Sequence, residues 1–189
     1  CGEVLAEALR RQGECVESLN VMQLEALPED PVMRQIWLNI DQYHKIIVIS
    51  PFAGVCLAEA LDRFWPQLPV GISYFSVGRA TAATLYEQLG VHVHVPSPTA
   101  GEDTSEALLS LSALQQLEHQ RILLVAGEGG RPLLADTLAE RGAEVTRLAV
   151  YRRRLAPLTP PLQARLNSGN YRALIVTSSE LLEHLAKWC

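Results

Sequence analysis

The sequence has no long apolar run. Apolar stretches such as residues 46–49 and 122–125 are far shorter than the roughly 20 residues that a membrane-spanning helix requires. Glu3, Glu7 and Arg10 interrupt the first turns of the chain, so this stretch does not resemble a secretory signal. We therefore expect no contact with a membrane and a cytoplasmic location.

Cysteine and positive charge are also scarce. The four cysteines include no CxxC pair, so they provide neither the ligand spacing of a zinc site nor a disulfide framework. The formal net charge of -5 argues against a nucleic-acid-binding protein, for which a strongly basic face is expected. Any attraction for an anionic ligand must then come from local groups and not from the net charge.

The common signatures of cofactor binding and covalent catalysis are missing as well. The cluster of Gly127, Gly129 and Gly130 is not followed by Gly-Lys-Ser/Thr, and it lacks the third glycine of a dinucleotide fingerprint. It can cradle an anion next to Arg131 or simply permit a tight turn. No Ser-His-Asp, Cys-His or paired-carboxylate arrangement can be assembled. We expect no cofactor and no metal, and a protein that mainly positions a reactive substrate.

What is present is a regular alternation of strand and helix patterns. A chain of 189 residues with 48% hydrophobic residues can bury one good core or two modest ones. Strands are expected at residues 46–50, 74–77, 91–95, 122–125, 145–150 and 173–177. Amphipathic helices are expected at residues 53–64, 80–89, 105–111 and 132–141, with Gly90 and Gly142 as left-handed ends of two of them.

Short connections between alternating strands and helices favour parallel pairing, and hence a doubly wound α/β sheet over residues 30–150. The prolines at residues 157–161 break this pattern, and a further strand and helix at Tyr171 and Ser179 indicate a second domain. The chain begins and stops inside helical patterns. The second domain is therefore expected to be incomplete, since one or two strands do not form a stable sheet.

Ligands of open parallel sheets bind outside the carboxyl ends of the strands. The turns expected there are rich in Ser, Thr and Gly, which suit carboxylates or phosphates, although such residues are more often simple helix N-caps. Three other features are noted. His92 and His94 lie on one face of an expected strand and could hold a metal, but no third ligand is evident. Cys56 lies on the apolar side of its helix and is expected to be a small core residue. Arg152, Arg153 and Arg154 form a solvated edge or contact a polyanion.

Six segments, in order, resemble the uroporphyrinogen-III synthase family. They are IIVISPFA at residues 46–53, YFSVGRATAATL at 74–85, TSEALL at 104–109, ILLVAGEGGRPLL at 122–134, GAEVTRLAVYRRR at 142–154 and LIVTS at 174–178. Each segment alone is a weak signature, but their order and spacing are fairly specific. Ala126 departs from the pattern, because bacterial members often carry arginine there.

The resemblance implies two doubly wound, flavodoxin-like parallel-sheet domains joined by a two-stranded β-ladder, with the active site in a cleft between them. Residues 28–147 would form domain two, and residues 1–21 with 155–189 would form domain one, incomplete in this chain. The ladder would pair residues 19–27 with residues 148–155.

The reaction implied is the dehydration and cyclisation of hydroxymethylbilane, with inversion of ring D, by a monomer without metal or cofactor. Tyr151 matches the family tyrosine that assists departure of the hydroxyl group, and its alternative role is packing at the domain junction. The implied substrate-binding residues, through hydroxyls, backbone amides or guanidinium groups, are Ser50, Gly78, Arg79, Thr81, Gly127, Arg131, Thr177 and Ser178.

A rival hypothesis is a two-lobed, non-enzymatic binding module that closes on a small anionic ligand. Its weakness is the lack of an export signal. Product analysis separates the two, because only the enzyme converts hydroxymethylbilane into the type III isomer.

Overall fold

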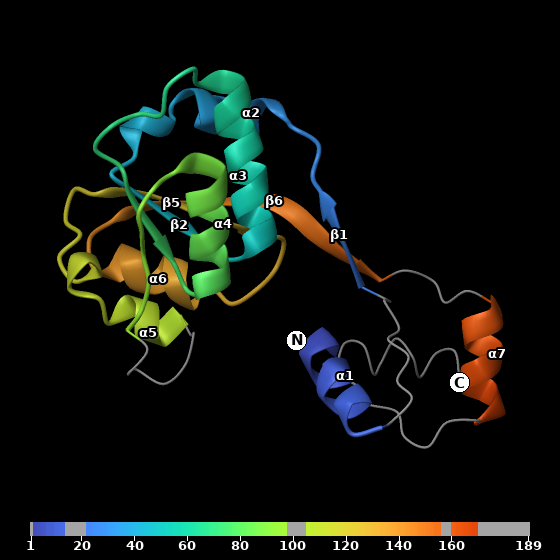
Figure 1. Cartoon of the computed structure of the whole chain (residues 1–189). Coiled ribbons are helices and arrows are strands. Elements are labelled where there is room, and N and C mark those ends of the chain that lie inside the picture. Colours follow the sequence, from blue (N-terminus) through green and yellow to red (C-terminus); the bar gives the residue numbers. More distant parts are fainter. Residues whose placement is uncertain (1, 14–21, 98–104, 156–159, 170–189) are drawn as a thin grey trace. The chain divides into compact units, whose positions relative to one another are not determined.

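The computed structural model describes residues 2–13, 22–97, 105–155 and 160–169. The chain divides into two compact units, one of Cys1–Gln23 with Arg153–Cys189 and one of Leu24–Arg152. Figure 1 labels the helices and most of the strands of both units. In the smaller unit, the described elements are the helices α1 (Gly2–Arg11) and α7 (Pro160–Ser168).

A six-stranded sheet, with the order β1-β6-β5-β2-β3-β4, organises the larger unit. Its strands are β1 (Met22–Ala26), β2 (Lys45–Val48), β3 (Ser73–Ser76), β4 (Val93–His94), β5 (Arg121–Gly127) and β6 (Glu144–Leu155). The pairings of β2 with β3, β2 with β5, β3 with β4 and β5 with β6 are all parallel. Strands β1 and β6 are hydrogen-bonded neighbours at one end of the order.

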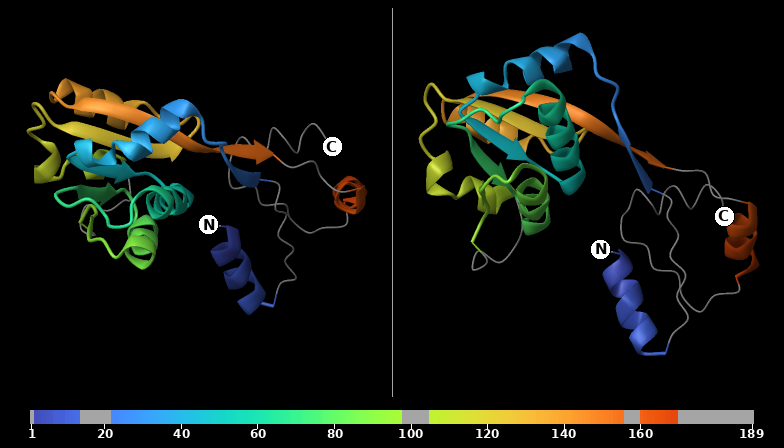
Figure 2. Two further views of the ribbon diagram at one scale, coloured as in Figure 1. Left: turned by 90° about the horizontal axis from the view of Figure 1, so that it is seen from above. Right: turned by 45° about the horizontal axis from the view of Figure 1, so that its top comes forward.

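Helices cover both faces of this sheet, as Figure 2 shows from two further directions. They are α2 (Pro31–Leu38), α3 (Pro51–Phe64), α4 (Arg79–Leu89), α5 (Ser105–Leu109) and α6 (Leu133–Glu140), with the short 3-10 turns η1 (Ile40–Gln42) and η3 (Ser112–Leu114).

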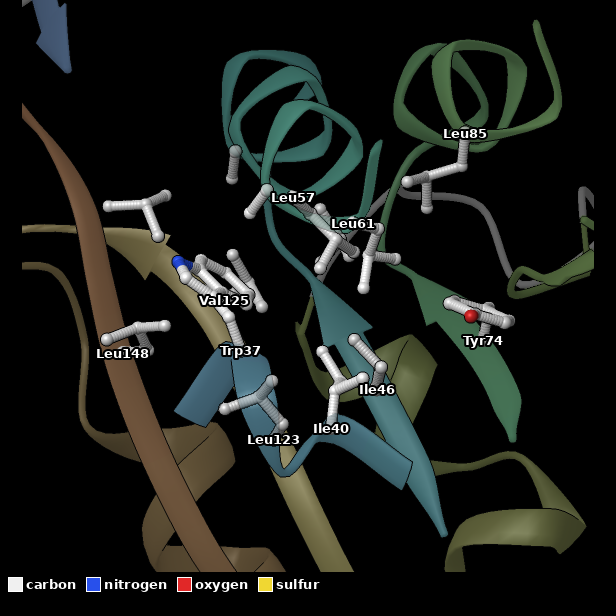
Figure 3. Close-up of a cluster of buried hydrophobic side chains, with 14 of the residues drawn as sticks. Trp37, Ile40, Ile46, Leu57, Leu61, Tyr74, Leu85, Leu123, Val125 and Leu148 are labelled. Atoms are coloured by element: carbon white, nitrogen blue, oxygen red, sulfur yellow. The ribbon is translucent and has the colours of Figure 1, made fainter. Parts of the chain in front are cut away.

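The side chains of the central strands alternate between two buried cores. Ile46 and Val48 of β2 belong to the core under α2, α3 and α4, whereas Ile47 belongs to the core under α5 and α6. Figure 3 shows the first core, in which Leu57 and Leu85 come from α3 and α4. Both faces of these strands are buried, which explains why they read as continuous apolar runs in the sequence.

Much of this architecture was predicted. The five strands expected within residues 46–150 correspond to β2 through β6, and the four expected helices correspond to α3 through α6. Gly90 and Gly142 have φ of 69° and 95°, which confirms the left-handed helix ends. The helical pattern at the start of the chain forms α1. No helix in the described ranges is long and apolar enough to cross a membrane.

The expected flavodoxin-like order was wrong. Counted from β2, the five parallel strands lie in the order 3-2-1-4-5, not 2-1-3-4-5. The chain moves from β2 through β3 to β4 in one direction before it returns to place β5 beside β2. Strands buried on both faces look alike in a sequence, so their pattern does not say on which side of its predecessor each one pairs.

Two helices were not predicted. Asp30 is the N-cap of helix α2, and its carboxylate accepts a hydrogen bond from the backbone nitrogen of Met33 at 2.7 Å, with Pro31 in the first turn. Helix α7 starts at Pro160, inside the segment that was read as a break. Proline is compatible with a first helical turn, where its missing N–H is not needed. The strand expected at residues 173–177 and the helix from Ser179 lie outside the described residues.

Candidate functional site

Three parallel strands end side by side at one edge of the sheet. Val48 of β2 pairs in register with Ser76 of β3 and with Val125 of β5. The chain direction across the sheet reverses between β2 and β5, and open α/β sheets bind ligands at such a reversal, outside the carboxyl ends of the strands. The loops that follow these strands therefore form the candidate site.

Ser50 links the loop after β2 to strand β6. It is the N-cap of α3, with φ -145° and ψ 161°, and its Oγ accepts a hydrogen bond from the Ala53 backbone nitrogen at 3.3 Å. The same Oγ lies 2.9 Å from the hydroxyl oxygen of Tyr151, and either oxygen can be the donor. The capping role weighed for Ser50 is confirmed, and the serine also contacts the predicted catalytic tyrosine.

A β-bulge turns Tyr151 toward Ser50. Ala126 of β5 pairs with Ala149, but the next residue, Gly127, pairs with Tyr151, so Val150 is an extra residue on β6. Strict alternation would place Val150 and Tyr151 on opposite faces, whereas both belong to the core under α3 and α4. Bulges commonly re-aim a side chain next to a functional site.

The ring of Tyr151 is held by its neighbours. A Cβ atom at Gly127 would lie 2.6 Å from Cζ of the tyrosine, so the ring occupies the space that any larger residue would need. The ring of Phe52 packs against it at a centroid distance of 5.1 Å and an interplanar angle of 79°. Tyr151 is 3% exposed and packs in the core under α3 and α4. Its role as a proton donor stays a prediction.

The start of α4 provides a second group of predicted residues at the same edge. Gly78 is its N-cap and offers no side-chain cap, while Ser76 donates a hydrogen bond from its hydroxyl to the Gly78 carbonyl at 2.8 Å. Thr81 is buried at 2% exposure. Arg79 is exposed and forms no ion pair with any described residue. The first backbone amides of α4 and one guanidinium group thus lie at the carboxyl end of β3.

The glycine-rich loop after β5 is stabilised by internal contacts. The Arg131 guanidinium forms an ion pair with the carboxylate of Glu106, and both side chains are more than half exposed, at 65% and 55%. Arg147 donates a hydrogen bond from Nη2 to the carbonyl of Gly129. A substrate carboxylate at Arg131 would have to compete with Glu106, and exposed pairs of this kind contribute about 0–1 kcal/mol.

Two predicted substrate-binding residues, Thr177 and Ser178, lie outside the described residues. In contrast, sequence reasoning missed Phe52 and the bulge at Val150. Phe52 lies in the first turn of α3, two residues after the N-cap Ser50. Its closeness to Ser50 in the sequence was a signal that it could lie near the same site. The bulge has no signal in the sequence, because it is visible only in the pairing of β5 with β6.

Three other candidates are described by the structure, namely the histidine pair, Cys56 and Arg152. The rings of His92 and His94 lie 5.0 Å apart, and the described part of the chain contains no group of three or more residues that could hold a metal. Cys56 packs half-buried against the core, as expected, and burial raises the pKa of its thiol. Arg152 is exposed and donates from Nε to the carboxylate of Glu25 at 3.1 Å, which raises the pKa of the arginine.

The fold and this edge define an open, mostly parallel α/β protein with a candidate ligand site at the reversal of its strand order. A family model described as uroporphyrinogen-III synthase HemD matches residues 3–189. The chain therefore belongs to the uroporphyrinogen-III synthase family.

Known proteins are similar to this chain in sequence, and a solved structure is similar to it in fold. The chain is 32% identical over 185 residues to the uroporphyrinogen-III synthase of Salmonella typhimurium, covering 97% of this chain and 74% of the relative. It is 31% identical over 188 residues to that of Escherichia coli, again covering 97% and 74%. A crystal structure of a mutant uroporphyrinogen III synthase from Thermus thermophilus matches with a TM-score of 0.60 at 24% identity, covering 88% of this chain and 63% of that one.

Family membership confirms the resemblance found in the sequence. It also confirms the class of function inferred from it, that of a cyclising lyase in porphyrin and haem biosynthesis. The comparisons do not favour the binding module.

Proposed function

We propose that this chain dehydrates and cyclises hydroxymethylbilane and inverts ring D as the macrocycle closes. The observation that carries the proposal is the hydrogen bond of 2.9 Å between Tyr151 and Ser50, which places a phenol at the reversal of the strand order in a chain of this family. A phenol is a hydrogen-bond donor that needs no cofactor.

In the proposed reaction, Tyr151 donates a hydrogen bond to the hydroxyl group that leaves ring A as water. The pyrrole nitrogen supplies the electrons that expel it, and the leaving group takes up one proton as it becomes water. The nitrogen then releases its own N–H proton, so a neutral azafulvene remains and only modest acid assistance is required. The substituted carbon of ring D attacks the azafulvene and forms a spiro intermediate, which fragments and recombines with ring D inverted. Spontaneous closure gives the uninverted isomer, so the enzyme must lower the barrier to one ring geometry relative to the other.

Substrate carboxylates would bind near the start of α4. Gly78 leaves the first amides of the helix without a side-chain cap, and Arg79 is exposed beside them. Amides and positive dipole at a helix N-terminus favour an anion, and a guanidinium group can bind a carboxylate in bidentate fashion. Thr81, Gly127 and Arg131 stay predictions as binding residues, and so do Thr177 and Ser178.

We also propose that the two compact units are the two domains expected from the resemblance. The division by contacts, at Gln23/Leu24 and Arg152/Arg153, supports the predicted boundaries of 1–21 with 155–189 and 28–147. The ladder of residues 19–27 and 148–155 as their connection stays a prediction, as do the monomeric state, the cytoplasmic location and the lack of a cofactor.

Product analysis tests the proposed function. The full chain is incubated with freshly prepared hydroxymethylbilane, and the type I and type III isomers are separated after oxidation. We expect type III to exceed the amount formed with heat-inactivated protein. Type I alone, formed at the spontaneous rate, would contradict the proposal.

A further inference from the structure

We propose that Ser50 is a positioning residue that donates its own proton to the oxygen of Tyr151 and so directs the tyrosine proton toward the substrate. The inference rests on the proposed function, in which Tyr151 is the donor to the leaving hydroxyl group. It replaces the expectation that Ser50 binds the substrate directly.

The direction of the hydrogen bond depends on which group accepts the proton of Tyr151. Its Oγ accepts from the Ala53 backbone nitrogen at 3.3 Å, which uses one lone pair and leaves its proton to be donated. Within the described residues, Tyr151 supplies the only other hydrogen-bonding atom that this hydroxyl contacts, at 2.9 Å. Either oxygen can be the donor in the free protein. Once a substrate oxygen accepts the proton of Tyr151, Ser50 can bond to the tyrosine oxygen only as a donor, and the lone pair and the proton of the serine are then both paired.

The same assignment leaves the proton of Tyr151 free for a substrate oxygen. Ser50 is the sole hydrogen-bond partner of the Tyr151 hydroxyl in the described part of the chain. The bond from Ser50 also offsets the negative charge that develops on the phenol oxygen as its proton moves toward the leaving group. Such a preorganised donor costs no rearrangement at the moment of reaction.

The surroundings of the ring keep the phenol in this orientation. Gly127 and Phe52 contact the ring, and the bulge at Val150 sets the face from which it projects. The Ser50 side chain is fixed in turn because it caps α3. The bulge in β6 and the cap of α3 thus hold Tyr151 and Ser50 at hydrogen-bond distance, in addition to the hydrogen bond between them.

Substitutions at Ser50 separate donation from capping. Ser50→Thr keeps both the cap and the donating hydroxyl. Ser50→Asp keeps the cap, since aspartate is a good N-cap, but an ionised carboxylate can only accept and would attract the tyrosine proton to itself. Ser50→Gly removes the donor, and as an N-cap glycine costs the helix much less stability than alanine would.

We expect Ser50→Thr to keep kcat for the type III isomer within about threefold of the unmodified chain. Ser50→Asp and Ser50→Gly should lower kcat by roughly tenfold or more, the effect of losing one hydrogen bond made in the transition state, while KM stays within about twofold. A second readout is the Cζ signal of Tyr151 in the NMR spectrum of chain labelled at tyrosine, assigned with Tyr151→Phe. It should shift in Ser50→Asp and Ser50→Gly.

Asp30→Gly is the matched control, because it removes the N-cap of α2, which accepts from Met33, without touching Tyr151. It should leave kcat and the Tyr151 signal unchanged. Equal activity of Ser50→Asp and the unmodified chain would overturn the inference, and so would an unshifted Tyr151 signal. If the unmodified chain forms only type I, the proposed function itself fails. If it forms type III and only the Ser50 variants behave otherwise than expected, the inference alone fails.

Discussion

Gly127 and Tyr151 are so close that a Cβ atom on the glycine would lie 2.6 Å from Cζ and 2.7 Å from Cε2 of the tyrosine ring. The glycine was expected to offer its backbone amide to the substrate. Its contact with the ring gives it a further role, which is to leave room for a buried phenol at the bulge between β5 and β6.

The first prediction follows from this contact. Gly127→Ala should displace the Tyr151 ring, lower type III formation by roughly tenfold or more, and cost about 1–3 kcal/mol of unfolding free energy, as overpacking does. Chemical denaturation and the product assay measure the two effects. Gly54→Ala is the control, since a Cβ there would meet Leu85 at an ordinary 3.5 Å and alanine favours the helix by about 0.5–1 kcal/mol. Equal behaviour of the two variants would contradict the prediction.

The second prediction concerns the hydroxyl group of Tyr151. Tyr151→Phe keeps the ring and its packing against Phe52 but removes the proton donor. Type III formation should fall by about 10²-fold or more, the usual contribution of general acid catalysis, while the unfolding free energy changes by roughly 1 kcal/mol. Steady-state kinetics with isomer separation provides the measurement. Tyr86→Phe, at a tyrosine that is 67% exposed, should have no effect. An unchanged rate would remove Tyr151 from the mechanism and leave the family assignment intact.

The third prediction concerns Tyr74, a core residue that is 5% exposed and whose hydroxyl has no hydrogen-bond partner among the described residues. An unpaired buried hydroxyl costs about 1–3 kcal/mol. Tyr74→Phe should therefore raise the unfolding free energy by about 1 kcal/mol, measured by denaturant titration at neutral pH. Tyr86→Phe serves as the control, and a destabilised Tyr74→Phe would show that the hydroxyl is paired in solution.

The fourth prediction is that the unfolding free energy falls at alkaline pH, because the pKa of Tyr74 is raised. Burial raises the pKa of Tyr74 above its ordinary value of 10.0, so the folded protein holds this proton more tightly than the unfolded chain does. The stability that comes from this difference in proton binding is fully present below pH 10.0, and it is lost as the pH rises through the pKa of Tyr74 in the folded protein. The thiol of Cys56, whose pKa is raised above 9.0 mainly by burial, acts in the same direction. Unfolding free energies measured from pH 8 to 11 should fall, and less steeply in Tyr74→Phe.

The fifth prediction concerns Arg141 at the end of α6. Its Nη1 donates to the carbonyls of Leu109 and Leu114, at 2.8 and 2.7 Å, and so satisfies backbone groups at the ends of α5 and η3. Arg141→Met should cost about 1–3 kcal/mol of unfolding free energy, because a partly buried carbonyl is left unpaired. Arg63→Met removes an exposed ion pair with Glu29 and should cost at most about 1 kcal/mol. Equal losses in the two variants would contradict the assignment.

Much of the fold and part of the site could be predicted. The buried strands β2 and β5 are recognisable as apolar runs, and Ser50 and Gly78 stand where helices begin after strands. The bond between Ser50 and Tyr151 was not predicted, since it joins residues 101 positions apart. Helix α2 had a visible signal in Asp30 and Pro31 that was not used, whereas the strand order had none.

The sequence by itself determined the alternation of strands and helices, the carboxyl edge that holds the candidate residues, and the family. These depend on local periodicity, on helix caps and on the order of short motifs, all of which are encoded within a few residues of one another. Only the tertiary structure decided the strand order and the face from which Tyr151 projects. A bulge changes the face of every residue after it, and it arises from the register between β5 and β6, which no single segment specifies.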